Sequence, residues 1–225
     1  MRLIIIQNGL IMKKLSKGLF LILFSTILMN ACDDIIGSGD DFDDNGVVKS
    51  IHGTILNWSL GDGYIVKLVV DTEAKDIFVA GTSSIDTSGK FNIQSLKDVP
   101  DNFLSELFHE YPDSLKCDNP NAKFSINASF LYVYDKAGTK IGKLSYSGFD
   151  LLNLISGIIV YSSEGTKITG SITDEDKQIK VNLRFEKGWN LYYVVFTENS
   201  DSTLVVNFTS EHQDGMHWSF TNNKD

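Results

Sequence analysis

This 225-residue chain contains few side chains whose spacing in the sequence suits acid–base catalysis, nucleophilic catalysis or metal binding. The cysteines and histidines are Cys32, Cys117, His52, His109, His212 and His217. His212 and His217 are five residues apart, so a strand would place them on opposite faces, where they could not share a metal ion. The sequence contains no H-E-x-x-H, G-x-S-x-G, P-loop or G-x-G-x-x-G pattern. We therefore expect a protein that is not an enzyme and needs no cofactor.

A partial cation-binding pattern occurs in Asp41-Phe-Asp43-Asp44-Asn45-Gly46. Asp41, Asp43 and Asn45 place oxygen donors at alternate positions, as in the first half of an EF-hand loop. Lys49 and His52 occupy the ninth and twelfth places, where such a loop needs further ligands. These three residues are weak candidates only, and we expect no metal site.

Aromatic residues beside amides and carboxylates are better candidates for binding a ligand. Such residues, in predicted loops or at strand ends, are Asn57, Trp58, Asp62, Trp189, Asn190 and Trp218. A loop tryptophan can stack on a sugar ring while neighbouring polar groups bond its hydroxyls, and end loops often carry function. The alternative is that the tryptophans fill the core, each with one hydrogen bond from its indole N–H.

The first residues resemble an export signal. Lys13, Lys14 and Lys17 precede an uncharged run over 18–29, which has the length of a signal h-region and is shorter than a membrane-spanning helix. Residues 1–11 do not fit this pattern, so Met12 is a candidate for the true start. We expect residues 1–31 to be a signal peptide.

The segment Leu28-Met29-Asn30-Ala31-Cys32 resembles the lipobox of bacterial lipoproteins, although Met29 and Asn30 depart from its consensus. The resemblance implies that Cys32 is lipidated and anchors the chain to a membrane. Residues 33–46 contain six aspartates and no basic residue, which is typical of an extended tether. An acidic run at this place also resembles a surface-export signal of one group of Gram-negative lipoproteins. We expect the outer face of the outer membrane, with the periplasmic face as the alternative.

The net charge of −9 is unevenly distributed. Residues 47–225 contain 16 basic and 23 acidic residues, which makes them mildly acidic. Binding to nucleic acid is disfavoured, because phosphate contacts need an excess of clustered Lys and Arg. If Cys32 is acylated, Cys117 is the remaining thiol, and the domain must fold without an internal disulfide.

From residue 47 onward the hydrophobic pattern has a period of two. Residues 178–186 alternate so that Ile179, Val181, Leu183 and Phe185 share one face, and a strand is likewise predicted over 124–134. Short strands separated by Gly, Asp, Asn and Ser predict an all-β antiparallel sandwich, either one large or two small ones divided near residue 150. Pro100 and Asp101 precede an apolar stripe, which predicts one short helix over 101–110.

Residues 47–98 carry a second resemblance. Ile51-His-Gly53-Thr-Ile, and later Asp86-Thr-Ser-Gly89-Lys-Phe91-Asn-Ile93, are similar to the carboxypeptidase regulatory-like (transthyretin-like) β-sandwich. The resemblance implies a non-catalytic module of a kind common in bacterial surface proteins.

These features predict a lipid-anchored, non-enzymatic envelope protein that binds a glycan, a peptide or a partner protein. A structural or assembly subunit is the first alternative, and an envelope hydrolase is the second. Ser114 and Ser202 lie in Asp-Ser-Leu and Asp-Ser-Thr, which resemble the O-glycosylation site of the same bacterial group and are weak candidates for that modification.

Overall fold

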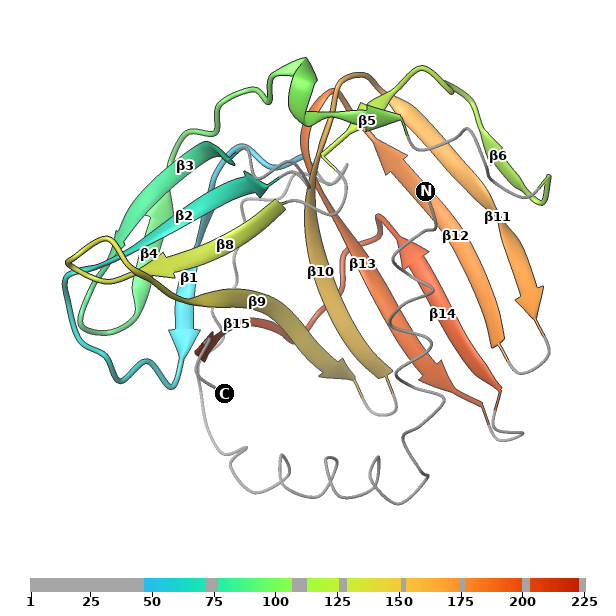
Figure 1. Ribbon diagram of the computed structural model, residues 1–225. Coiled ribbons are helices and arrows are strands. Elements are labelled where there is room, and N and C mark those ends of the chain that lie inside the picture. Colours follow the sequence, from blue (N-terminus) through green and yellow to red (C-terminus); the bar gives the residue numbers. More distant parts are fainter. Residues whose placement is uncertain are drawn as a thin grey trace. The chain divides into compact units, whose positions relative to one another are not determined.

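The computed structural model describes residues 47–71, 77–106, 113–125, 129–150, 153–174, 177–199 and 203–222 (Figure 1). The calcium-ligand candidates and Cys32 therefore lie outside the described residues. Within the described ranges the fold is all-β, as predicted. The strands are β1 (Ile51–Leu56), β2 (Tyr64–Asp71), β3 (Ile77–Ile85), β4 (Lys90–Ile93), β5 (Ser105–Glu106), β6 (Leu115–Cys117), β7 (Lys123–Phe124), β8 (Ser129–Tyr134), β9 (Lys140–Asp150), β10 (Asn153–Ser162), β11 (Thr166–Asp174), β12 (Lys177–Phe185), β13 (Gly188–Glu198), β14 (Leu204–Thr209) and β15 (Met216–Asn222).

Most of these strands join one long path in the order β3-β2-β8-β9-β10-β13-β14-β12-β11-β6. A branch leaves this path at β9, which also pairs with β15; β15 pairs with β1, and β1 pairs with β4. The pairing is antiparallel except between β1 and β15 and between β12 and β14, which are parallel. Strands β9 and β10, on either side of residue 150, form an antiparallel hairpin.

Two hydrophobic clusters lie on either side of β10, because successive side chains of a strand point to opposite faces. The larger cluster takes Ile155, Ile159 and Tyr161 from β10 and packs them with residues of β1, β2, β4, β9, β13 and β15. The smaller cluster takes Val160 and packs it with Phe124, Phe185 and residues of β11 and β12. One strand thus supports both clusters.

The predicted alternation over 178–186 agrees with the structure. Leu183 and Phe185 are buried in the smaller cluster and Val181 packs against it, while Lys180, Asn182 and Arg184 are exposed. The strand predicted over 124–134 is interrupted. It forms β7 and β8, and between them the buried Ser125 hydroxyl accepts a hydrogen bond from the Tyr161 N–H (2.8 Å) and contacts the Ser129 hydroxyl (2.8 Å).

The predicted helix over 101–110 is wrong. Asp101–Phe103 form a single 3-10 turn, and Leu104 is already extended (φ −107°, ψ 142°). Ser105 and Glu106 then pair with Phe124 and Lys123, so their backbone bonds to another strand rather than within a helix. No side chain caps the turn, which leaves this short apolar stripe without the local interactions that start a helix. Residues 107–112 lie outside the described residues.

Two turns have the same construction, at residues 86–89 and 135–138. In each turn the aspartate Oδ1 accepts hydrogen bonds from the backbone N–H groups two and four residues later, at 2.8–2.9 Å. Each ends on a glycine in the left-handed region, Gly89 at φ 81° and Gly138 at φ 80°. The side-chain bond from Ser88, with these backbone bonds, lowers the pKa of Asp86. The 135–138 turn joins the antiparallel pair β8 and β9, whereas the 86–89 turn connects β3, which pairs with β2, to β4, which pairs with β1.

Candidate functional site

The loop between β1 and β2 brings Asn57, Trp58 and Asp62 together, but the Trp58 ring turns inward. Its Nε1 donates to the Gly61 carbonyl (2.8 Å), and its ring meets those of Tyr64 and Phe220 edge-on at 5.5 Å. Asn57 is exposed with a left-handed backbone (φ 56°). Asp62 forms an exposed ion pair with Lys136 (3.4 Å). The loop is thus held by its own tryptophan and a neighbouring turn.

Trp189 and Asn190 are structural residues at the start of β13. The Trp189 ring is 4% exposed, and its Nε1 donates to the Lys97 carbonyl (2.9 Å). The Asn190 amide is buried and bonds to the Glu186 N–H, the Glu186 carbonyl and the Gly188 carbonyl at 2.8–2.9 Å. These bonds close the β12–β13 turn, and no part of either side chain is left to contact a ligand.

Trp218 has a similar role on β15. It is 6% exposed, its Nε1 donates to the His52 carbonyl (3.2 Å), and its ring lies 4.7 Å from Tyr146 and 5.5 Å from Phe91. The structure therefore places Trp189 and Trp218 in the core, as in the alternative stated for the tryptophans, and packs the partly buried Trp58 against it. Ser114 is exposed in the turn before β6, while Ser202 lies outside the described residues.

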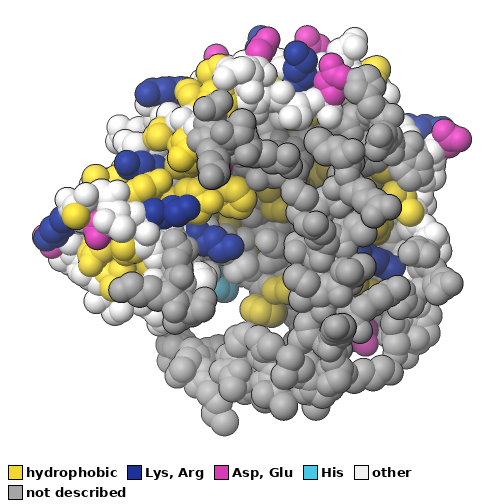
Figure 2. Space-filling model, in the orientation of Figure 1, with side chains coloured by type: hydrophobic (Ala, Val, Ile, Leu, Met, Phe, Trp, Pro, Cys, Tyr) yellow, Lys and Arg dark blue, Asp and Glu magenta, His cyan; other side chains and the backbone are white. Residues whose placement is uncertain are grey.

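A strip of aromatic and basic side chains crosses β2 and β8. Figure 2 shows hydrophobic side chains next to Lys and Arg side chains on this part of the surface. Phe130 stacks on Tyr132 (5.5 Å), while Lys140 Nζ lies 4.1 Å from the Tyr132 ring and Lys67 Nζ 4.2 Å from the Tyr134 ring. Because lysines already lie over both tyrosine rings, these rings are poor platforms for stacking a sugar.

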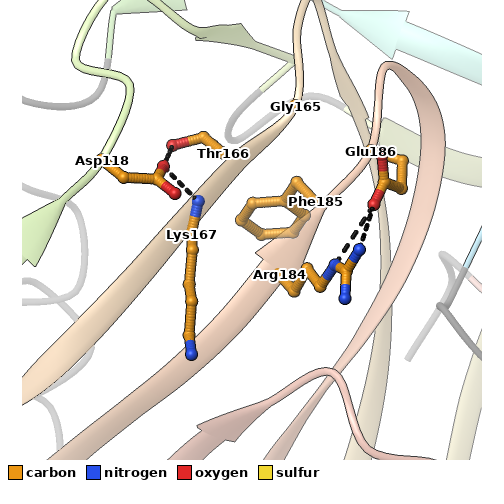
Figure 3. Close-up of a pocket in the computed structure, with 7 residues that line it drawn as sticks. All are labelled: Asp118, Gly165, Thr166, Lys167, Arg184, Phe185 and Glu186. Carbon is orange, nitrogen blue, oxygen red and sulfur yellow. Dashed lines mark hydrogen bonds and ion pairs between the residues drawn. The ribbon is translucent and has the colours of Figure 1, made fainter.

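A shallow pocket of about 380 Å³ opens where the turn after β6 meets β11 and β12. Its walls are Asp118, residues 165–167 at the start of β11, and residues 184–186 at the end of β12 (Figure 3). Arg184 is held by Glu186, whose Oε1 accepts from Nε (3.2 Å) and Nη2 (3.0 Å). The Lys167 side chain runs away from Asp118 (Figure 3). The pocket therefore presents both signs of charge to a ligand.

Asp118 anchors the pocket wall through its carboxylate. Its Oδ1 accepts hydrogen bonds from the Lys167 N–H (2.6 Å) and the Thr166 hydroxyl (2.9 Å). These bonds favour the ionised carboxylate and lower the pKa of Asp118. Cys117, the preceding residue, is half-buried, with Sγ 3.2 Å from the Thr166 hydroxyl oxygen and 3.3 Å from the Asn119 carbonyl.

The pocket opens at one end of a polar sheet surface that carries four basic residues. Lys167 lies directly opposite Arg184 across β11 and β12, and the same face of the sheet holds Lys116 on β6 and Lys180 on β12. We call Lys116, Lys167, Lys180 and Arg184 the basic face. All four are exposed. The strand residues between them on β11 and β12 carry hydroxyl and amide groups, as in Thr169, Ser171 and Asn182.

No protein family model, curated protein or solved structure matches this chain. Among the described residues, no group of three or more His, Cys, Asp or Glu side chains is placed to hold a metal ion. The described residues also include no helix that is both long and apolar enough to cross a membrane.

Sequence reasoning missed the basic face. Polar and apolar residues alternate over 167–173 and 178–184, so the sequence shows which residues of each strand are polar. Their assembly depends on the register that places Lys167 beside Arg184 and Thr169 beside Lys116. Local spacing along the sequence carries no information on that register.

Proposed function

We propose that this chain is a lipid-anchored, non-enzymatic binding protein of the Gram-negative envelope, displayed on the outer face of the outer membrane. The basic n-region, the short apolar run and the small residue before Cys32 support the anchor. The aspartate-rich segment over 33–46 supports export and would hold the domain away from the lipid, because like charges extend a tether.

We further propose that residues 47–225 form a β-sandwich. The resemblance of residues 47–98 to the carboxypeptidase regulatory-like module supports this arrangement, as does the larger hydrophobic cluster, in which residues of β10 and β13 pack with residues of β1, β2 and β4. A sandwich buries one side of each sheet and leaves the other side to solvent. Its solvent side then provides a broad surface for recognition.

The ligand in this proposal is a glycan, and the observation that carries it is the polar surface of β11 and β12 that ends in the pocket. Hydroxyl and amide side chains alternate there with exposed basic residues, and such groups bond the hydroxyls of a sugar chain. The pocket at one end, with Asp118 and Arg184 in its wall, suits a terminal or branching sugar unit.

The anchor is tested by Cys32→Ser. We expect the wild-type chain, expressed in a Gram-negative host and labelled metabolically with radioactive palmitate, to carry the label and to fractionate with the outer membrane. The serine variant should carry no label, because its hydroxyl does not accept the diacylglyceryl group. Cys117→Ser is the matched control and should label normally. An unlabelled parent chain would show that this is not a lipoprotein.

Binding is tested with the full chain in detergent against an array of bacterial and plant glycans. We expect retention of a restricted set of glycans and loss of that binding when Asp118→Ala alters the pocket wall. Asp150→Ala, which changes an exposed carboxylate at the end of β9, is the control and should leave binding unchanged. An array without any retained glycan would contradict the glycan-binding proposal.

A further inference from the structure

The basic face collects positive charge on a domain that is acidic as a whole. It holds four of the 16 basic residues of 47–225, although this part of the chain also contains 23 acidic residues. None of the residues that share this face on β6, β11, β12 and β14 is acidic. The positive charge is therefore local, set within a surface that repels anions elsewhere.

The register of the sheet places like charges next to one another. Lys167 and Arg184 are direct cross-strand partners, an arrangement that destabilises a sheet when no anion lies between the two side chains. Glu186 neutralises Arg184 from the side. Within the described residues, no carboxylate forms an ion pair with Lys116, Lys167 or Lys180. Three ammonium groups thus remain available to an external anion.

The dimensions suit an extended chain rather than a single ion. Lys180 and Arg184 are four residues apart on β12, which is about 14 Å along the strand. Lys167 and Lys116 extend the charge across β11 to β6, one strand spacing of about 4.8 Å at each step. Hydroxyl and amide groups fill the intervals, so a ligand must offer both repeated negative charges and hydroxyl groups.

From this arrangement, and resting on the proposed glycan-binding function, we propose that the basic face binds an acidic polysaccharide, with its carboxylate or sulfate groups on Lys116, Lys167 and Lys180. Nucleic acid is the less suitable polyanion. The strand residues of this face include no aromatic ring on which a base could stack, and the acidic remainder of the domain opposes so dense a charge.

The test compares K116Q/K167Q/K180Q with the control K49Q/K90Q/K97Q, which removes equal charge from exposed lysines elsewhere. Polygalacturonate and chondroitin sulfate probe carboxylate and sulfate separately, with dextran as the neutral glycan and polyglutamate and duplex DNA as other polyanions. Titration of the full chain in detergent should show binding of an acidic polysaccharide. The basic-face variant should bind it about tenfold more weakly near 0.1 M salt, since each exposed pair contributes modestly. The control variant should change affinity less than twofold.

Several results would overturn the inference. These are no binding of either acidic polysaccharide, equal loss in both variants, or binding of DNA or polyglutamate at least as tight as that of the polysaccharides. If the full chain retains only neutral glycans on the glycan array, the proposed glycan-binding function stands and the proposal of an acidic polysaccharide ligand is refuted. If it retains no glycan, both proposals fail. A salt dependence that is shallower in the basic-face variant than in the control would add independent support.

Discussion

Replacement of Trp218 by alanine is expected to lower the free energy of unfolding by about 3–5 kcal/mol, the usual cost of removing a buried aromatic side chain. The ring is 6% exposed and packs between Tyr146 and Phe91. It also joins β15 to β1, because its Nε1 bonds to the His52 carbonyl. Urea unfolding of the full chain, followed by circular dichroism, measures the loss.

Trp218→Phe separates packing from the hydrogen bond. Phenylalanine keeps most of the apolar contact and loses the bond to His52, so about 1–2 kcal/mol should be lost. If the alanine variant lost less than about 1 kcal/mol, Trp218 would not be the core residue described here. A ring that instead stacked on a ligand would change ligand affinity without this loss of stability.

Replacement of Gly89 by alanine is expected to cost about 2–4 kcal/mol, as the sum of backbone strain and steric overlap. Gly89 has φ 81°, a conformation that a side chain disfavours. A Cβ at this position would lie 2.6 Å from the Trp58 Cβ and 3.0 Å from the Ile55 carbonyl oxygen. The Ile55 N–H bonds to the Gly89 carbonyl, so the overlap would disturb the edge of β1 as well.

Gly138→Ala is the matched control, because the chain contains the same turn twice. Gly138 has φ 80° in a turn with the same aspartate bonds, but a Cβ there would meet no atom within 4 Å. It should therefore show the strain alone, about 1 kcal/mol. Equal losses in the two variants would mean that the overlap of the added Cβ at position 89 with Trp58 costs no measurable stability.

The local patterns of the sequence predicted the strands well and the isolated helix badly. Over 178–186 the period of two follows from strand geometry and needs no knowledge of the partner strand. The turns at 86–89 and 135–138 likewise depend on local chemistry, because aspartate and glycine act on their own backbone. The stripe over 101–110 failed because a few apolar residues do not stabilise a helix when another strand, here β7, satisfies the backbone.

The roles of the candidate binding residues required contacts between distant parts of the chain. Trp218 bonds to His52, 166 positions away, and Trp189 bonds to Lys97, 92 positions away. The sequence marks such tryptophans as amphipathic, yet it does not say whether the carbonyl that receives the indole N–H lies in the core or on a ligand. Their burial was decided by tertiary packing.

The alternating composition, the two aspartate–glycine turns and the mild acidity of residues 47–225 belong to the sequence alone, since each depends on neighbouring residues or on a count. The basic face belongs to the tertiary structure. It exists because β6 and β12 pair on either side of β11 in one register, and a shift of one residue would turn Lys167 and Arg184 to opposite faces of the sheet. The inward or outward alternation of each strand is encoded locally, but the neighbour that stands beside it is selected by the packing of the whole domain.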